Sequence, residues 1–267
     1  MKSIDSAFFD ISSLETLAQQ DSPVHRLDPR AKLITSAVFI LSVVSFGKYE
    51  ISGMLPFFLF PVCLAASGNI PIDYILKKIV LVAPFAFFIG IFNPFFDQKI
   101  IYSIGTVSIS GGWLSFTSIL LRFLLTVSAA LILIAVSGFR EICLALEKLH
   151  TPRAFAIQLL FLYRYIFVLI SEAGRMIRAR SLRTFHTRGM GVTVAGSMIG
   201  HLLIRTLNRA QRIHMAMLCR GFDGEIRLMR TLSFTTTDWL FMTCWSLFFL
   251  AMRLYNIPEY LGLLFTG

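Results

Sequence analysis

Charge is scarce in this sequence, and acidic charge is the scarcer kind. Charged residues make up 15% of the chain, with 15 Asp and Glu against 25 Lys and Arg. A soluble domain of 267 residues would need far more charge than this on its surface. Hydrophobic residues instead reach 56% and stand in long blocks. The composition therefore excludes an ordinary soluble domain and predicts an all-α integral membrane protein.

Cysteine is also scarce, and no two cysteines form a C-x-x-C pair. The five histidines show no spacing typical of a zinc site. These absences predict no disulfide framework, no metal site and no cofactor. A phosphate-binding loop of the form G-x-x-x-x-G-K-[ST] is missing as well, so any ATPase that works with this chain must be a separate protein. The cysteines are Cys63, Cys143, Cys219 and Cys244.

The basic excess gives the chain a net charge of +10. In a soluble protein this charge would indicate nucleic-acid binding. In a membrane protein the simpler cause is the accumulation of Lys and Arg on cytoplasmic loops. We therefore expect the basic residues to lie beside a lipid bilayer, and we do not expect the protein to bind nucleic acid.

The first 30 residues are predicted to be an N-terminal cytoplasmic segment, 1–30. They begin MKSIDSAFFDISSLETLAQQ, which carries acids and lacks an apolar run with a cleavage site, so we do not expect a signal peptide. The stretch LDPRAK then indicates a helix start, with Asp28 placed to cap and Pro29 at the first helical position. The first span should begin there and stay as a membrane anchor.

Five apolar runs are each about long enough to cross a bilayer, which takes roughly 20 helical residues. They occupy 31–47, 51–67, 79–95, 113–136 and 238–256. The first four form a membrane unit at 31–136, and the last belongs to a C-terminal segment at 237–267. Prolines within these runs predict kinks, which membrane helices tolerate. Between the third and fourth runs, DQKIIYSIGTVSISGG alternates and turns at Gly105, so a small hairpin and a plain external loop are both open.

The region 137–236 is predicted to be a cytoplasmic helical insert. Its apolar run at 156–170 has only 15 residues and carries Arg164 near its middle, where a charge is costly in a bilayer. From Glu172 to Arg230 there are eleven arginines and three acids. A crossing at 156–170 would put these arginines outside, against the tendency of basic residues to stay cytoplasmic. We expect this run to pack against the membrane part, and a further crossing is the alternative.

One basic phrase occurs twice, as ARSLRTF from Ala179 and as AMLCRGF from Ala216, 37 residues later. Both copies read Ala-x-x-x-Arg-x-Phe, with Arg183 and Arg220 at the equivalent place. Gly221 favours a helix stop after the second arginine, so we expect two helices that each end in an arginine. Such arginines suit anionic lipid headgroups or a two-fold protein partner whose carboxylates pair with the guanidinium fork. The repeated frame favours the protein partner.

These stretches resemble the transmembrane T component of energy-coupling-factor transporters, most of all its cobalt and nickel branch. The resemblance spans nearly the whole chain, and its most specific element is AMLCRGFDG. The other matching stretches are HRLDPRAKL at 25–33, LEKLHTPRA at 146–154, YRYIFVLISEAGRMIRAR at 163–180 and TDWLF at 237–241.

The resemblance implies a non-catalytic, multi-pass scaffold in the bacterial cytoplasmic (inner) membrane. In this family two ABC-type ATPase subunits bind two coupling helices, and a separate membrane subunit binds the substrate, here cobalt or nickel. A vitamin transporter built on the same scaffold is the alternative. A membrane enzyme that acts on a phosphorylated lipid is a weaker alternative, because few acids lie near the arginines. A self-contained channel is also weaker, because Arg122 is the one ionisable residue in the middle part of a predicted span, away from the span ends.

The resemblance also assigns the ATPase contacts to two x-Arg-x signatures. These are Leu182-Arg183-Thr184 and Cys219-Arg220-Gly221. The family often has Ala-Arg-Gly, and the first copy lacks the Gly, so Arg180 is a rival of Arg183 for the first contact. The internal repeat favours Arg183. Ala179 and Ala216 would allow close crossing of another helix, and Met217 would pack in the ATPase socket.

Overall fold

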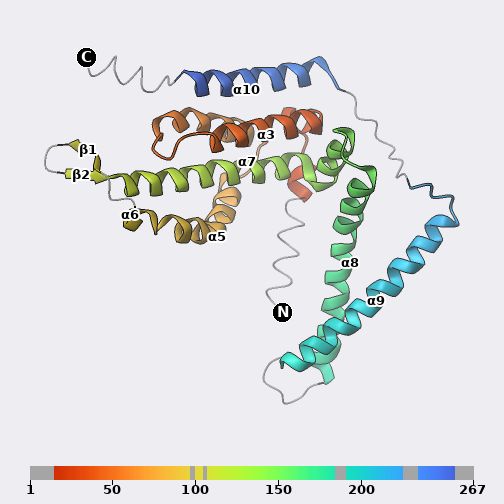
Figure 1. Cartoon of the computed structure of the whole chain (residues 1–267). Coiled ribbons are helices and arrows are strands. Elements are labelled where there is room, and N and C mark those ends of the chain that lie inside the picture. Colours follow the sequence, from red (N-terminus) through yellow and green to blue (C-terminus); the bar gives the residue numbers. More distant parts are fainter. Residues whose placement is uncertain (1–14, 97–99, 105–106, 184–190, 225–233, 256–267) are drawn as a thin grey trace. The chain divides into compact units, whose positions relative to one another are not determined.

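The computed structural model describes residues 15–96, 100–104, 107–183, 191–224 and 234–255, which are almost entirely helical (Figure 1). These residues fall into two compact units, one made of 15–142 with 234–255 and the other of 143–224. The predicted all-α membrane fold is confirmed, with one small hairpin added. The elements are α2 (Pro23–Arg26), α3 (Pro29–Val44), the 3₁₀ helix η1 (Ser52–Phe58), α4 (Leu59–Ser67), α5 (Ile72–Gly90), α6 (Asn93–Phe96), β1 (Ile100–Ile104), β2 (Val107–Ser110), α7 (Gly111–Lys148), α8 (Arg153–Arg183), α9 (Val192–Leu218) and α10 (Thr236–Leu254).

A hairpin lies between the third and fourth predicted spans. Strands β1 and β2 pair antiparallel, with Ile104 opposite Val107 and Ile100 opposite Ser110. The alternating residue types in the sequence of this stretch are typical of a β-strand. Of the two alternatives that the sequence left open, the hairpin is confirmed and the plain loop is wrong.

The apolar run at 51–67 is broken in two. Its first part forms η1 and its second part forms α4. Pro56 lies inside η1, and proline has no backbone N–H to give to a continuous α-helix. The helix type therefore changes from 3₁₀ to α two residues after this proline, and the predicted kink stays a prediction.

Two helices in the described part of the chain are long and apolar enough to cross a membrane, by length and composition: α7 with 38 residues and α8 with 31. α7 bends at Gly138, whose φ is 71°, a value that glycine adopts without steric cost. α8 contains the run 156–170 and continues to Arg183. The run is therefore part of a longer helix than its 15 apolar residues indicate. The charge argument for a cytoplasmic position does not depend on helix length, and this placement stays a prediction.

The first and last long helices of their unit, α3 and α10, lie side by side (Figure 1) and share an aromatic core with η1 and α4. Phe39, Phe57, Phe60 and Phe249 are fully buried. The ring centroids of Phe39 and Phe60 are 4.7 Å apart, and the edge-on pair of Phe60 and Phe249 is separated by 5.1 Å. Tilted and edge-to-face rings pack favourably, so this core joins the two ends of the sequence.

Two arginines satisfy the carbonyl groups at the end of α3. Arg122 of α7 donates to the carbonyl oxygens of Phe46 at 2.8 Å and Gly47 at 2.6 Å. Arg253 of α10 donates to the carbonyl oxygen of Ser45 at 3.0 Å. Carbonyls at and just beyond a helix C-terminus have no intrahelical partner, so these bonds cap α3. The interhelical contacts explain Arg122 without a transport path.

The start of α3 is capped as the LDPRAK stretch predicts. The Asp28 side chain accepts a hydrogen bond from the Arg30 N–H at 2.8 Å, and Pro29 is the first helical residue. The Asp28 N–H in turn donates to the Asp238 carboxylate at 2.8 Å. The same carboxylate accepts from the Thr235 N–H at 2.8 Å, in the capping box of α10. One buried side chain therefore holds the starts of two helices.

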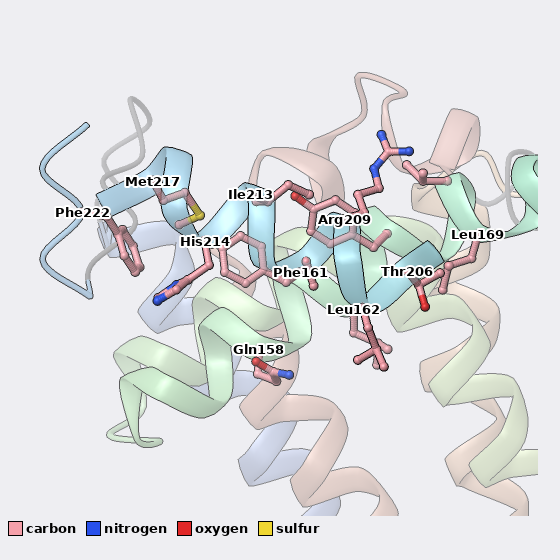
Figure 2. Close-up of a pocket in the computed structure, with 14 residues that line it drawn as sticks. Gln158, Phe161, Leu162, Leu169, Thr206, Arg209, Ile213, His214, Met217 and Phe222 are labelled. Atoms are coloured by element: carbon pink, nitrogen blue, oxygen red, sulfur yellow. The ribbon is translucent and has the colours of Figure 1, made fainter. Parts of the chain in front are cut away.

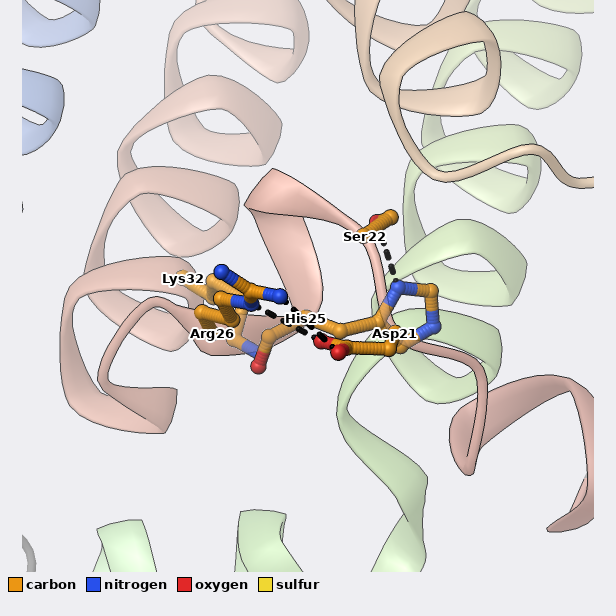
Figure 3. A network of polar contacts seen from close by, with 5 residues as sticks. All are labelled: Asp21, Ser22, His25, Arg26 and Lys32. Carbon is orange, nitrogen blue, oxygen red and sulfur yellow. Dashed lines mark hydrogen bonds and ion pairs between the residues drawn. The ribbon is translucent and has the colours of Figure 1, made fainter.

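A polar network precedes α3 (Figure 3). The buried His25 ring lies 2.7 Å from the Ser22 hydroxyl through Nδ1 and 3.0 Å from the Leu17 carbonyl oxygen through Nε2. Since a carbonyl can only accept, Nε2 carries the proton and Nδ1 accepts from Ser22. Burial lowers the pKa of His25, and the positive charge of Lys32 acts in the same direction. Burial therefore favours neutral His25, although the hydrogen bond to the Leu17 carbonyl raises the pKa.

The folded state is expected to become less stable as the pH drops. The loss occurs over the pH range in which His25 takes up a proton in the unfolded chain but not in the folded one. The unfolded imidazole titrates near about 6.5, and the lowered folded pKa means that the unfolded state binds the proton first. We expect the unfolding temperature in detergent to decrease from pH 7.5 towards pH 5, with a smaller decrease in His25→Gln. His214→Gln, at an exposed position, serves as the control. Identical pH dependence in wild type and His25→Gln would contradict this.

Candidate interaction site on α8 and α9

The first copy of the repeated phrase ends α8. Arg180 and Arg183 lie in the last turn of the helix. Arg180 is partly buried, whereas Arg183 is exposed and Leu182 beside it is 77% exposed. The Arg183 side chain makes no hydrogen bond or ion pair with any residue that the structure describes. Thr184, the third residue of the first signature, lies outside the described residues.

The second copy ends α9 in a glycine-dependent turn. Gly221 has a φ of 78°, a left-handed conformation that glycine adopts at little cost. The Phe222 N–H donates to the Met217 carbonyl oxygen and the Gly221 N–H to the Leu218 carbonyl oxygen, both at 3.0 Å. These two bonds define a Schellman motif, so the predicted helix stop at Gly221 is confirmed.

This turn divides the residues of the second copy, AMLCRGF, into those that line a groove and those that stay exposed (Figure 2). Phe222 turns back and lines a groove with Met217, while Cys219 and Arg220 stay exposed. The Arg220 side chain has no ion pair or hydrogen-bond partner among the described residues. The basic side chain at the helix end is therefore presented outward, and the flanking Met and Phe anchor the turn to the groove.

The predicted contact residues are mostly accessible. Ala179 and Ala216 are exposed, as expected of positions kept open for another helix. Met217 is partly buried in the groove of its own chain, a contact that the sequence did not predict. The structure thus brings Met217 and Phe222 together and leaves the two equivalent arginines, Arg183 and Arg220, at the ends of different helices.

The groove between α8 and α9 has a volume of about 450 Å³ and is mostly apolar (Figure 2). Phe161, Leu162 and Tyr165 of α8 face Leu207 and Ile213 of α9 across it. Sequence reasoning did not find this groove, because helical periodicity gives the apolar face of each helix but not the angle at which two helices meet.

Glu172 connects the two helices. It contacts Arg175 one turn further along α8, as expected for an i, i+3 pair. It also accepts a hydrogen bond from Arg205 of α9 at 2.8 Å. The intrahelical pair follows from the spacing of the two residues in the sequence. The interhelical bond was missed, since it joins residues 33 positions apart that only the fold brings together.

Within the described ranges, no three His, Cys, Asp or Glu side chains are grouped so that they could hold a metal ion. The site therefore consists of helix ends, an apolar groove and unpaired guanidinium groups. In proteins generally, guanidinium groups and apolar grooves of this kind are features by which another molecule can be recognised.

Comparison with known proteins supplies the context for this site. The model of the family described as cobalt transport protein, CbiQ, matches residues 20–232. The energy-coupling factor transporter transmembrane protein EcfT of Ruminiclostridium cellulolyticum is 30% identical over 82% of this chain and 87% of its own length. The EcfT protein of Bacillus subtilis is 28% identical over 76% of this chain and 82% of its own length. The cobalt transport protein CbiQ of Rhodobacter capsulatus is 36% identical over 27% of this chain and 30% of its own length.

Proposed function

This chain belongs to the CbiQ family of cobalt transport proteins, and on that premise we propose that it is the energy-coupling scaffold of an importer for cobalt or nickel. The resemblance to T components that the sequence indicates is confirmed by the family match and by relatives named as transmembrane proteins of energy-coupling factor transporters. The family consists of transport proteins, so the alternative of a membrane enzyme is wrong.

The observation that carries the proposal is the pair of exposed arginines at the ends of α8 and α9. Arg183 and Arg220 each follow an exposed alanine by four residues, and neither has a partner among the described residues. A guanidinium fork pairs well with a carboxylate in a protein socket. Two ABC-type ATPase subunits would each receive one arginine, and ATP binding and hydrolysis would move the helices. A separate membrane subunit would hold the metal.

Exposure favours Arg183 over Arg180 as the first contact. A side chain that enters a socket on another protein must leave the surface of its own chain. Arg183 is exposed, whereas Arg180 is partly buried and has an interaction within its own chain. The proposal therefore keeps the pairing of Arg183 with Arg220 that the internal repeat indicates.

The choice of cobalt or nickel rests on the family description. The relatives that match most of this chain are named only as energy-coupling factor transmembrane proteins, so a vitamin transporter is the second candidate. The bacterial cytoplasmic membrane is the proposed location, with the 137–236 insert on the cytoplasmic side because of its arginines.

Uptake measurements test the proposal. The chain would be produced with the ATPase and substrate-binding subunits found in its own organism, in cells that lack their own cobalt and nickel importers. We expect uptake of labelled Co²⁺ or Ni²⁺ that disappears when this chain is omitted. Uptake of a labelled vitamin without metal uptake would support the second candidate, and uptake that does not require this chain would contradict both.

A further inference from the structure

A second cavity, of about 240 Å³, adjoins the apolar groove between α8 and α9. Four residues line both spaces: Val168, Leu169, Thr206 and Arg209. Figure 2 shows Arg209 at the Leu169 end of the groove, away from Met217 and Phe222. The two spaces therefore share part of their walls, and the second carries most of the polar side chains.

The polar cavity has an excess of positive charge. Three arginines line it with one acid, Glu172. The Glu172 carboxylate is already bonded to Arg205 at 2.8 Å and also contacts Arg175. Arg209 and Arg212 have no ion pair with any residue that the structure describes. The cavity is thus suited to an anionic group that can accept hydrogen bonds from guanidinium groups.

The change from apolar to basic lining coincides with the same change in the sequence of α8. The apolar run 156–170 ends just before Glu172, and ten of the eleven arginines between Glu172 and Arg230 follow from Arg178 onwards. Basic side chains gather where a membrane-associated helix leaves the hydrocarbon, close to the anionic headgroups. The polar cavity therefore has the composition of a headgroup-level site, and the groove has that of a site for hydrocarbon.

We infer that these two adjoining spaces bind one anionic phospholipid, with its phosphate between Arg209 and Arg212 and an acyl chain in the groove. A free phosphate ion would use the arginines but not the apolar groove. A zwitterionic lipid would bring a positive group into a cavity that already has an excess of cations. The site goes beyond the proposed transport function and does not require the identity of the transported substrate.

Lipid binding by the full chain in mild detergent tests the inference. Purified protein would be stripped of lipid, mixed with dioleoyl phosphatidylglycerol or dioleoyl phosphatidylcholine, and bound lipid counted by native mass spectrometry. We expect one tightly held phosphatidylglycerol and far weaker binding of phosphatidylcholine. Arg209→Gln with Arg212→Gln should weaken phosphatidylglycerol binding about 30-fold, given the usual contribution of each arginine near anionic lipid. Lys77→Gln with Arg140→Gln, at two exposed positions outside both cavities, should bind as wild type does.

A groove variant separates a lipid from a free anion. Ala210 is exposed and lines the groove, so Ala210→Phe should fill the space for the acyl chain while it keeps every arginine. We expect this variant to lose phosphatidylglycerol, and millimolar inorganic phosphate not to displace the lipid from wild type. Normal lipid binding by Ala210→Phe, or displacement by phosphate, would overturn the inference in favour of a free-anion site.

Two further outcomes would also overturn it. Equal lipid binding by the double glutamine variant and its control would show that the arginines do not recognise the lipid. Loss of a co-purifying ATPase from the glutamine variant, with lipid retained, would assign the arginines to a protein partner. Folding is checked by size exclusion, and Arg212→Gln alone, with an expected effect of about fivefold, replaces the double variant if that variant aggregates.

Discussion

Arg183→Glu combined with Arg220→Glu is expected to abolish ATPase binding and leave the chain folded. Both side chains are exposed and have no partner among the described residues, so their replacement removes no contact within this part of the fold. In a carboxylate socket, the reversed charge replaces an attraction with a repulsion. Loss of one member of a buried charge pair typically costs about 2–5 kcal/mol, and two such losses weaken binding by about a thousandfold or more.

Affinity purification in mild detergent from the native operon measures this effect. The amount of ATPase that co-purifies with wild type is compared with that of the double variant, after size exclusion has shown that both are folded. Lys77→Glu with Arg140→Glu carries the same change of charge at exposed positions and should retain the ATPase. Arg180→Glu alone tests the rival contact and should have the smaller effect of the two first-copy changes.

Retention of the ATPase by the double variant would refute the docking role of the repeated phrase. If no ATPase binds even to wild type, the coupling proposal fails, and the alternative of arginines that face lipid headgroups returns. The lipid experiment on Arg209 and Arg212 uses different residues and a different measurement, so the two proposals can fail separately.

Asp238→Ala is expected to destabilise the membrane unit strongly. Asp238 is buried, and only 2% of the surface of the residue is exposed. It accepts hydrogen bonds from the Asp28 N–H at 2.8 Å, the Thr235 N–H at 2.8 Å and the Thr235 hydroxyl at 2.6 Å. Alanine would leave these donors without their acceptor and remove the negative charge from the N-terminal ends of α3 and α10. We expect a loss of about 3 kcal/mol.

Thermal unfolding in detergent measures this loss. Asp238→Asn keeps an oxygen acceptor without the charge and should lie between alanine and wild type. Asp73→Ala removes an acid from the first turn of α5, at an exposed position, and serves as the matched control. Equal unfolding temperatures for Asp238→Ala and Asp73→Ala would show that the buried carboxylate does not hold the two helices.

The sequence by itself determined the features that depend on near neighbours in the chain. Asp28 caps α3 through the N–H of Arg30, two residues away, and Gly221 ends α9 through bonds that span at most five residues. The 3₁₀ segment around Pro56 and the pair of Glu172 with Arg175 are equally local. Residue type and spacing are enough in each case, because a helix sets the distance between positions three or four apart.

The motifs of the family resemblance were also visible in the sequence, but their contacts were not. LDPRAKL and TDWLF meet through a hydrogen bond between residues 210 positions apart. Glu172 reaches Arg205 on another helix, and Phe222 turns back into a groove built by α8 and α9. Only the tertiary structure decided these contacts, because they depend on the angle and distance between packed helices. Those are set by the side chains of both helices at once, which the periodicity of one segment does not contain.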